Sequence, residues 1–426
     1  MKGTFLAQGH KYWILPILYI ISAAALALLV DIVDRSGPLY EVLPEIFLTR
    51  AGLAKDVMSS IATSLLTMTT ITFSVMMVVL STYTSQYSPR TLPNFIRSKA
   101  MQHAQGVFFA GFVYSITSML FLKRTSTDTM VPDASVGVLL AVCCLLFFIY
   151  FIHRISMLIQ VNRLIAEIGA HALNLLQFLQ PADAPRNAKA SDKSQSRLAV
   201  VLAKNEGYIR SVDIQSVVNL AERNGWRIRM GPRIGAYVEQ GAPLLEIFGT
   251  PHTGINSDNL DRMISIGKDR TNTHDLEYVL ENIAEMALRA ISPGINDPNT
   301  AIYCIRELGV ILTRMASTDC SSWTFSDSTG TLRLEIPFLP YADLLYKCFY
   351  QIRHYGAKDI SVSAALLDAL TRIALNGDPR IKKTAQEFGD NVIQGINPGV
   401  LQSLDQSYLE QKKRQLSEAC GIIPGS

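Results

Sequence analysis

The chain has 426 residues, of which 49% are hydrophobic and only 18% are charged. A typical soluble protein carries about a quarter charged residues, so this composition favours a membrane-spanning portion over a wholly soluble chain. The formal net charge of +3 is too small to indicate a nucleic-acid partner.

Four apolar segments, of 18 to 26 residues, are each long enough to cross a bilayer as a helix. They run from Trp13 to Val30, from Val57 to Thr82, from Gln105 to Leu122 and from Ser135 to Ile152. The first is followed by Asp31 rather than by a small-residue cleavage site, so it is not typical of a cleaved signal peptide. Four spans place both termini on one side of the membrane.

The second span carries an unusual number of hydroxyl groups. At about 100° per residue, its hydroxyls concentrate in a stripe roughly 60° wide, which Met77 and Val78 interrupt. The stripe consists of Thr63, Thr67, Thr70, Ser74, Ser81, Ser85 and Ser88. At about 1.5 Å per residue it is roughly 37 Å long, which exceeds a hydrocarbon core of about 30 Å.

Two interpretations of this stripe stay open. Small polar residues help membrane helices to pack closely, which requires no further function. Alternatively, the stripe lines a water path in a homo-oligomer, with Met77 and Val78 as an apolar constriction that gates by losing water. In the third span, Gly106, Ala110 and Gly111 allow close helix approach under either interpretation.

The distribution of Lys and Arg in the short flanks predicts the orientation. Seven lie on the side of the termini and five on the opposite side. The seven are Lys2, Lys11, Arg90, Arg97, Lys99, Arg154 and Arg163, and the five are Arg35, Arg50, Lys55, Lys123 and Arg124. This margin favours cytoplasmic N- and C-termini. The six cysteines show no metal or disulfide spacing, which is typical of a reducing compartment.

Beyond the fourth span, apolar residues keep helical spacing from Arg154 to Leu179, so we expect one long helix that leaves the membrane. We therefore assign residues 1–180 to the transmembrane domain. Residues 181–196, rich in Pro, Ala, Ser and charge, are typical of a linker.

Residues 197–255 are predicted to form a small β-rich module, because short β-like runs alternate with glycines. Between them, a short helix is expected to end at Gly225. The piece from Gly235 to Ile247 resembles the turn-and-strand pattern of biotinyl- and lipoyl-type domains. The lysine that would carry a prosthetic group is missing from this piece, so we expect no cofactor.

Residues 256–426 are predicted to be mainly helical, apart from one hairpin in SSWTFSDSTGTLRLEIPF. The loop SPGINDP lies between a helix that ends near Ile291 and another that starts at Pro298. Asp297 is well placed to cap the second helix, so the loop is typical of a rigid corner. Its backbone amides could instead bind a ligand, for which the candidate residues are Ser292, Gly294, Asn296 and Asp297.

One acidic cluster invites a catalytic or metal interpretation. Glu277, Glu281 and Glu285 recur every four residues beside His274 and Asp275. A metal site would require further ligands from elsewhere, whereas a solvated helix face requires none, so we expect the solvated face. The sequence also lacks a phosphate-binding loop and a nucleophile elbow, and it predicts no catalytic residues and no enzyme.

Three motifs together resemble one family. They are the Tyr-Ser-Pro-Arg run closing span two, the glycine-rich strand piece, and EMALRAISPGINDPNTAI. The chain resembles, along nearly its whole length, the bacterial predicted membrane proteins grouped only as a domain of unknown function. The resemblance implies a multi-pass inner-membrane protein and supplies no activity.

The fold predicted from the sequence is therefore α+β, with an N-terminal four-helix transmembrane bundle followed by a cytoplasmic domain. The function predicted is a homo-oligomeric ion channel or pore whose cytoplasmic domain regulates it, with a small ion or ligand and the lipid bilayer as partners. The alternative is a membrane-anchored sensor or scaffold that binds a ligand or partner without conduction.

Overall fold

A computed structural model describes residues 3–36, 44–86, 99–122, 127, 129–158, 160–179, 196–249, 257–317, 322–397, 399 and 401–422. The chain divides into two compact units, Met1–Gln160 and Val161–Ser426. The run at 87–90 and the predicted linker up to residue 195 lie outside the described residues.

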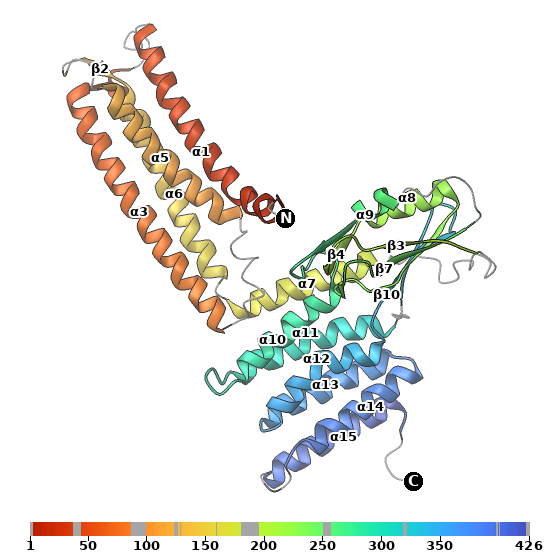
Figure 1. Ribbon diagram of the computed structural model, residues 1–426. Helices are drawn as coiled ribbons and strands as arrows, with labels where there is room; N and C mark the ends of the chain where they lie inside the picture. The colour runs from red at the N-terminus through yellow and green to blue at the C-terminus, as the bar shows by residue number, and fades with distance from the viewer. Residues whose placement is uncertain are drawn as a thin grey trace. The chain divides into compact units, whose positions relative to one another are not determined.

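The described residues of unit 1 form four long helices (Figure 1). They are α1 (Gly3–Ser36), α3 (Ala51–Gln86), α5 (Lys99–Leu122) and α6 (Asp133–Leu158). A short 3-10 helix (Glu45–Phe47) and two strands, β1 (Thr49–Arg50) and β2 (Met130–Val131), lie between them in the chain. Among the residues that the structure describes, the helical segments long and apolar enough to cross a membrane are Trp13–Asp34, Ala51–Thr82, Met101–Leu122 and Asp133–Met157. The four predicted spans are confirmed, and each is a few residues longer than the hydropathy indicated.

Helix α5 is the centre of this unit, because it packs against α1, α3 and α6. The predicted close approach at its small residues is present. A Cβ atom added to Gly106 would overlap the ring of Tyr19 in α1, and one on Gly111 would lie 2.7 Å from Cδ1 of Leu65 in α3. Glycine therefore allows neighbouring helices to come within contact of the α5 backbone.

The fourth span does not continue as one long helix, contrary to the prediction. Helix α6 ends at Leu158, and a separate helix α7 (Val161–Leu179) begins unit 2. Helical spacing of apolar residues does not reveal this break, because it is present in both α6 and α7. The two helices differ in how they bury those residues. In α7 a narrow stripe that includes Ile165, Ala172 and Leu176 is buried against α10 and α11.

The strands described in unit 2 form two small sheets. The five-stranded sheet has the order β3-β7-β5-β10-β9, and the three-stranded sheet has the order β6-β4-β8. Their strands are β3 (Arg197–Leu202), β4 (Gly207–Val212), β5 (Arg227–Met230), β6 (Tyr237–Val238), β7 (Pro243–Phe248), β8 (Ile264–Gly267), β9 (Ser322–Ser326) and β10 (Leu332–Pro337). The predicted hairpin is β9–β10, and β10 pairs in parallel with β5. A boundary at residue 256 therefore does not separate a β module from a helical domain, since the later hairpin completes the earlier sheet.

Of the remaining helices of unit 2, α8 and α9 pack against the strands, and the six from α10 to α15 pack against one another (Figure 1). They are α8 (Ile214–Asn224), α9 (Ser257–Arg262), α10 (Leu276–Ala290), α11 (Pro298–Ala316), α12 (Tyr341–Gly356), α13 (Ile360–Asn376), α14 (Pro379–Gln394) and α15 (Ser403–Cys420). Helix α8 ends as predicted, at Gly225 in the left-handed conformation with φ of 67°. Helix α13 packs against four of these helices, α11, α12, α14 and α15.

Candidate functional sites

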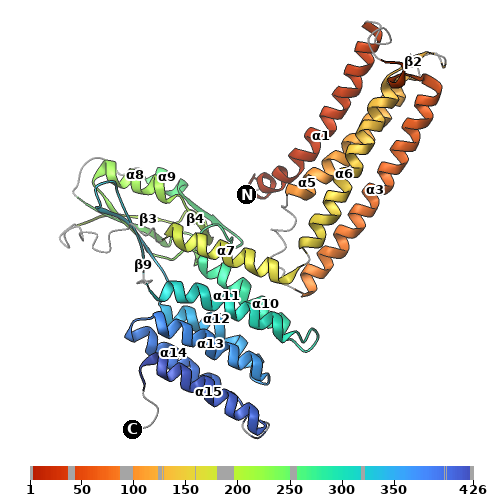
Figure 2. The same cartoon turned by 180° about the vertical axis from the view of Figure 1, so that it is seen from behind.

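The residues proposed from the sequence as pore-lining form one face of α3, which we call the outward stripe. All seven are exposed in the single chain: Thr63, Thr67, Thr70, Ser74, Met77, Val78 and Ser81. The buried side chains of α3, such as Leu65 and Thr72, lie on the opposite side of the helix, toward α5 and α6. Figures 1 and 2 show α3 at the edge of the bundle in both views, with α1 at the other edge. The stripe therefore does not pack the four spans of one chain together.

Three hydroxyl groups of the stripe are satisfied by their own helix. Thr63, Thr67 and Thr70 each donate to the carbonyl oxygen four residues earlier, at 3.0 Å. Such bonds let a hydroxyl lie in an apolar setting without a further partner. These hydroxyls are therefore compatible with lipid, with a second copy of the helix or with water.

The exposed faces of the other spans have a different chemistry. The exposed residues of α1 and α6 are predominantly aliphatic, for example Ile17 and Ile21 in α1 and Leu139 and Leu146 in α6. Aliphatic side chains are what a face in contact with lipid tails requires. The exposed surface of α3 is thus richer in hydroxyls than those of α1 and α6, although Leu53, Leu66 and Ile71 are also exposed on α3.

The SPGINDP loop is a tight corner between α10 and α11. The Asp297 carboxylate accepts hydrogen bonds from the backbone N–H of Thr300 at 3.2 Å and from its hydroxyl at 2.6 Å. The predicted cap is therefore present, with Pro298 in the first turn. Of the other candidates, Ser292 donates to the carbonyl of Arg289, and Asn296 lies in the left-handed region with φ of 52°.

A cavity of about 400 Å³ opens beside this corner. It is lined by Asn162, Asp297, Asn299, Thr300, Ile302, Tyr303 and Arg306. The structure thus brings Asp297 into a polar cavity, but Ser292, Gly294 and Asn296 do not line it. The exposed guanidinium of Arg306 and the amides of Asn162 and Asn299 give this cavity the capacity to bind a small polar ligand.

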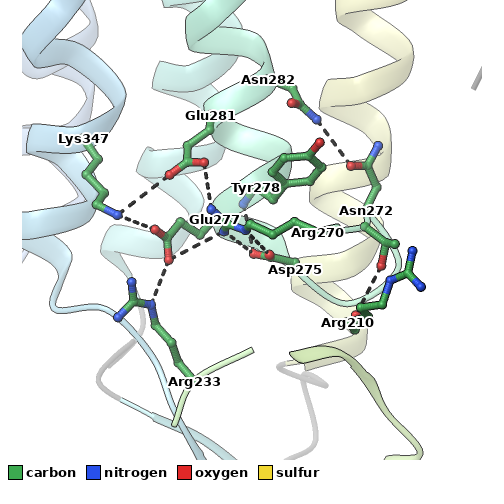
Figure 3. A network of polar contacts seen from close by, with 11 residues as sticks. Arg210, Arg233, Arg270, Asn272, Asp275, Glu277, Tyr278, Glu281, Asn282 and Lys347 are labelled. Carbon is green, nitrogen blue, oxygen red and sulfur yellow. Dashed lines mark hydrogen bonds and ion pairs between the residues drawn. The ribbon is translucent and has the colours of Figure 1, made fainter. Parts of the chain in front are cut away.

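The acidic cluster is not a solvated helix face, so that interpretation is wrong for Glu277. Its side chain is only 2% exposed and lies in a charge network around Arg270 (Figure 3). Arg233 donates to Glu277 at 3.0 Å, and Lys347 also donates to it. Arg270 binds Asp275 through two nitrogens, at 2.7 and 2.9 Å, and Glu281 through a third at 2.9 Å.

This network connects parts of unit 2 that are distant in sequence. Arg233 follows β5, Arg270 follows β8, the carboxylates belong to the start of α10, and Lys347 is on α12. Burial alone would raise the pKa of Glu277, but its ion pairs with Lys347, Arg233 and Arg270 overcome that effect and lower the pKa. The network connects the sheets to the helices. Removing any one of its charges would leave an opposite charge without compensation, which would destabilise the folded state.

His274 lies in the same part of unit 2 as this charge network. We do not consider it a candidate acid or base. Its Nδ1 accepts a hydrogen bond from the backbone N–H of Val212 at 3.3 Å, and its ring stacks on Phe178 of α7 with centroids 5.4 Å apart. Burial lowers the pKa of this imidazole. Within the described ranges, no group of three or more His, Cys, Asp or Glu side chains could hold a metal ion.

Sequence reasoning missed the cationic half of the network. Arg233 and Lys347 lie 44 and 70 residues in sequence from the carboxylate that they both bond, and Arg270 lies 5 and 11 residues from its two carboxylate partners. The one sequence signal near them is Gly235, at φ of 83°, where a Cβ atom would overlap the Asp275 carboxylate. A glycine at this position leaves room for the ion pair between Arg270 and Asp275. The sequence alone indicated only that this glycine belongs to a turn.

Residues 9–372 match a family described as "Predicted membrane protein (DUF2254)". Uncharacterized proteins of Mycobacterium tuberculosis and Mycobacterium bovis are similar to this chain, each 28% identical over 375 residues. Those matches cover 85% of this chain and 72% of each relative. No solved structure matches. The chain belongs to this family of predicted membrane proteins.

Proposed function

We propose that this member of the predicted membrane protein family forms a homo-oligomeric ion channel in the bacterial inner membrane. In this proposal the outward stripes of α3 from several subunits surround a shared axis. The N- and C-termini are cytoplasmic, and unit 2 regulates conduction. Catalysis is no part of the proposal, since the sequence carries no nucleophile elbow or phosphate-binding loop.

The chemistry of the exposed α3 face supports the proposal most directly. Its hydroxyls point away from the chain's own bundle, whereas the exposed faces of α1 and α6 are aliphatic. A face that lines water benefits from hydroxyls, and a face against lipid tails does not. From Thr63 to Ser81 the stripe is about 27 Å long at 1.5 Å per residue, close to the thickness of a hydrocarbon core.

Met77 and Val78 provide the gate in this mechanism. Their side chains are 61% and 66% exposed and interrupt the hydroxyls between Ser74 and Ser81. A narrow apolar ring stays dry and blocks ions until it widens or becomes polar. The closed state of the pore therefore needs no plug other than these two side chains.

A matched pair of serine substitutions tests the gate. In a reconstituted planar bilayer, Val78→Ser is expected to raise ion conductance at least tenfold, because a hydroxyl lets the constriction hold water. Leu139→Ser on α6 is the control, since Leu139 is equally exposed at 64% but lies on the aliphatic face. Conductance that stays unchanged in Val78→Ser, in a folded oligomer, would refute the channel.

Cysteine cross-linking tests the arrangement independently of conduction. In a background without native cysteines, Thr70→Cys is expected to form intersubunit disulfides under mild oxidation, because the stripes meet at the axis. Leu139→Cys should stay monomeric on a non-reducing gel. Cross-linking at residue 139 but not at residue 70 would place α6, not α3, between subunits.

A second function is favoured by the cavity at the corner of α10 and α11. Its volume of about 400 Å³ and its polar lining suit a small polar ligand of a membrane-anchored sensor. A ligand at 100 times its Kd would stabilise unit 2 by about 2.7 kcal/mol. Ligand-dependent stabilisation of the full chain that Arg306→Ala abolishes, without any conductance, would favour the sensor.

A further inference from the structure

One carboxylate lies in register with the outward stripe, two helical turns before its first hydroxyl. Asp56 precedes Thr63 by seven residues, and seven residues return an α-helix to nearly the same angle. Asp56 is exposed, as the stripe is, and it falls inside the candidate span Ala51–Thr82. The exposed Ser59 and Ser60 fill the turn between Asp56 and Thr63, so the polar face is continuous.

The Asp56 carboxylate has no ionic partner among the described residues. It borders an apolar cavity of about 480 Å³, whose other walls include Ile61 of α3 and Val138 and Leu145 of α6. Among the residues that the structure describes, no cation therefore neutralises it. An ionisable group within a membrane helix is costly unless it faces water or a partner, which makes it a mark of an ion path.

The neighbouring charges lie either at another angle on the helix or before it in the chain. Lys55 is rotated by about 100° from Asp56, toward the packed side of α3, and is half-buried. Arg50 precedes the helix in β1, and Glu45 lies in the preceding 3-10 helix. Asp56 is thus the charged residue of α3 whose angle coincides with that of Thr63 and Thr70.

We infer that Asp56 forms a ring of carboxylates at the mouth of the pore and makes the channel select small cations over anions. The inference rests on the proposed channel, because only convergence of the α3 stripes brings the carboxylates of several subunits together. Repeated negative charge at a narrow mouth attracts cations and repels anions, as acidic rings do in cation channels. The ring also supplies the specificity that the hydroxyl stripe lacks, since neutral hydroxyls serve either sign of ion.

The test measures reversal potential across a tenfold KCl gradient, with full-length Val78→Ser protein in a planar bilayer. A purely cation-selective pore reverses about 59 mV from zero, because a tenfold ratio corresponds to about 59 mV for one charge. We expect the Val78→Ser channel to reverse toward that limit. Adding Asp56→Asn should bring the reversal potential close to zero, and adding Asp56→Lys should change its sign.

Two controls separate the stripe from other charge near the mouth. Glu45→Gln removes an exposed carboxylate outside the stripe, and Lys55→Gln removes the adjacent cation. Both should leave the cation preference in place. A Glu45→Gln variant that loses selectivity as fully as Asp56→Asn would overturn the assignment to Asp56.

Charge rescue covers the case in which Asp56→Asn alters assembly. In a background without native cysteines, Asp56→Cys should lose selectivity, regain it with a negatively charged methanethiosulfonate and invert it with a positively charged one. A current whose reversal potential ignores these reagents and the Asp56 variants keeps the channel but overturns the ring. A folded Val78→Ser oligomer with no current overturns both the channel and the inference.

Discussion

Replacing Glu277 by glutamine tests whether the charge network holds unit 2 together. Glutamine keeps the shape but removes the negative charge, so Arg233, Arg270 and Lys347 face only Asp275 and Glu281. Breaking a buried ion pair from one side costs about 3–5 kcal/mol. Arg233 and Lys347 are 35% and 39% exposed and can turn toward water, so we expect the low end, about 3 kcal/mol.

The assay is urea unfolding of the full chain in detergent, followed by tryptophan fluorescence. Trp226 and Trp323 are 4% and 2% exposed in unit 2, and Trp13 is the third tryptophan. A Trp13→Phe background therefore makes the signal report unit 2 alone. The control is Glu387→Gln, whose carboxylate is 64% exposed in a surface pair with Lys383 and should cost less than about 1 kcal/mol.

The pH dependence gives a second readout of the same carboxylate. Because the folded pKa of Glu277 lies below its ordinary value of 4.5, its stabilisation is complete above pH 4.5 and is lost as the pH falls through the folded pKa. Glu277→Gln should therefore flatten the acid side of the stability profile. Equal losses for Glu277→Gln and Glu387→Gln, or a coupling energy near zero between Glu277→Gln and Lys347→Gln, would refute the reasoning.

Two further predictions concern the corner and the topology. Asp297→Ala should destabilise unit 2 by about 1 kcal/mol through loss of its bonds to Thr300, and Asp297→Ser should restore most of that, measured by the same unfolding assay. Unchanged stability of Asp297→Ala together with loss of a bound ligand would instead make Asp297 a binding residue. In intact cells without native cysteines, a membrane-impermeant maleimide should label Thr127→Cys between α5 and α6 and leave Asn299→Cys of unit 2 unlabelled, since the Lys and Arg distribution predicts cytoplasmic termini. The reverse labelling pattern would invert the orientation.

Local chemistry in the sequence was enough to predict the elements that depend on neighbouring residues. The spans follow from apolar runs between charged flanks. The cap at Gly225 follows from the left-handed backbone that glycine allows, and the cap at Asp297 follows from a side chain that bonds within its own turn. The hydroxyl stripe was likewise visible, because helical periodicity places residues on a face without knowledge of what lies opposite.

Tertiary packing determines which neighbours each of those helix faces contacts. Periodicity could not tell whether the stripe of α3 turned toward α5 and α6 or away from them, and the structure turns it away because Leu65 and Thr72 bury the opposite side. Periodicity also could not predict that the fourth helix ends at Leu158. Apolar residues continue at helical spacing beyond it, while the segments that bury them change. Glu277 shows the limit most clearly: a carboxylate at helical spacing predicts a solvated face, and only the arrival of Arg233 and Lys347 from distant segments makes it a buried ion pair.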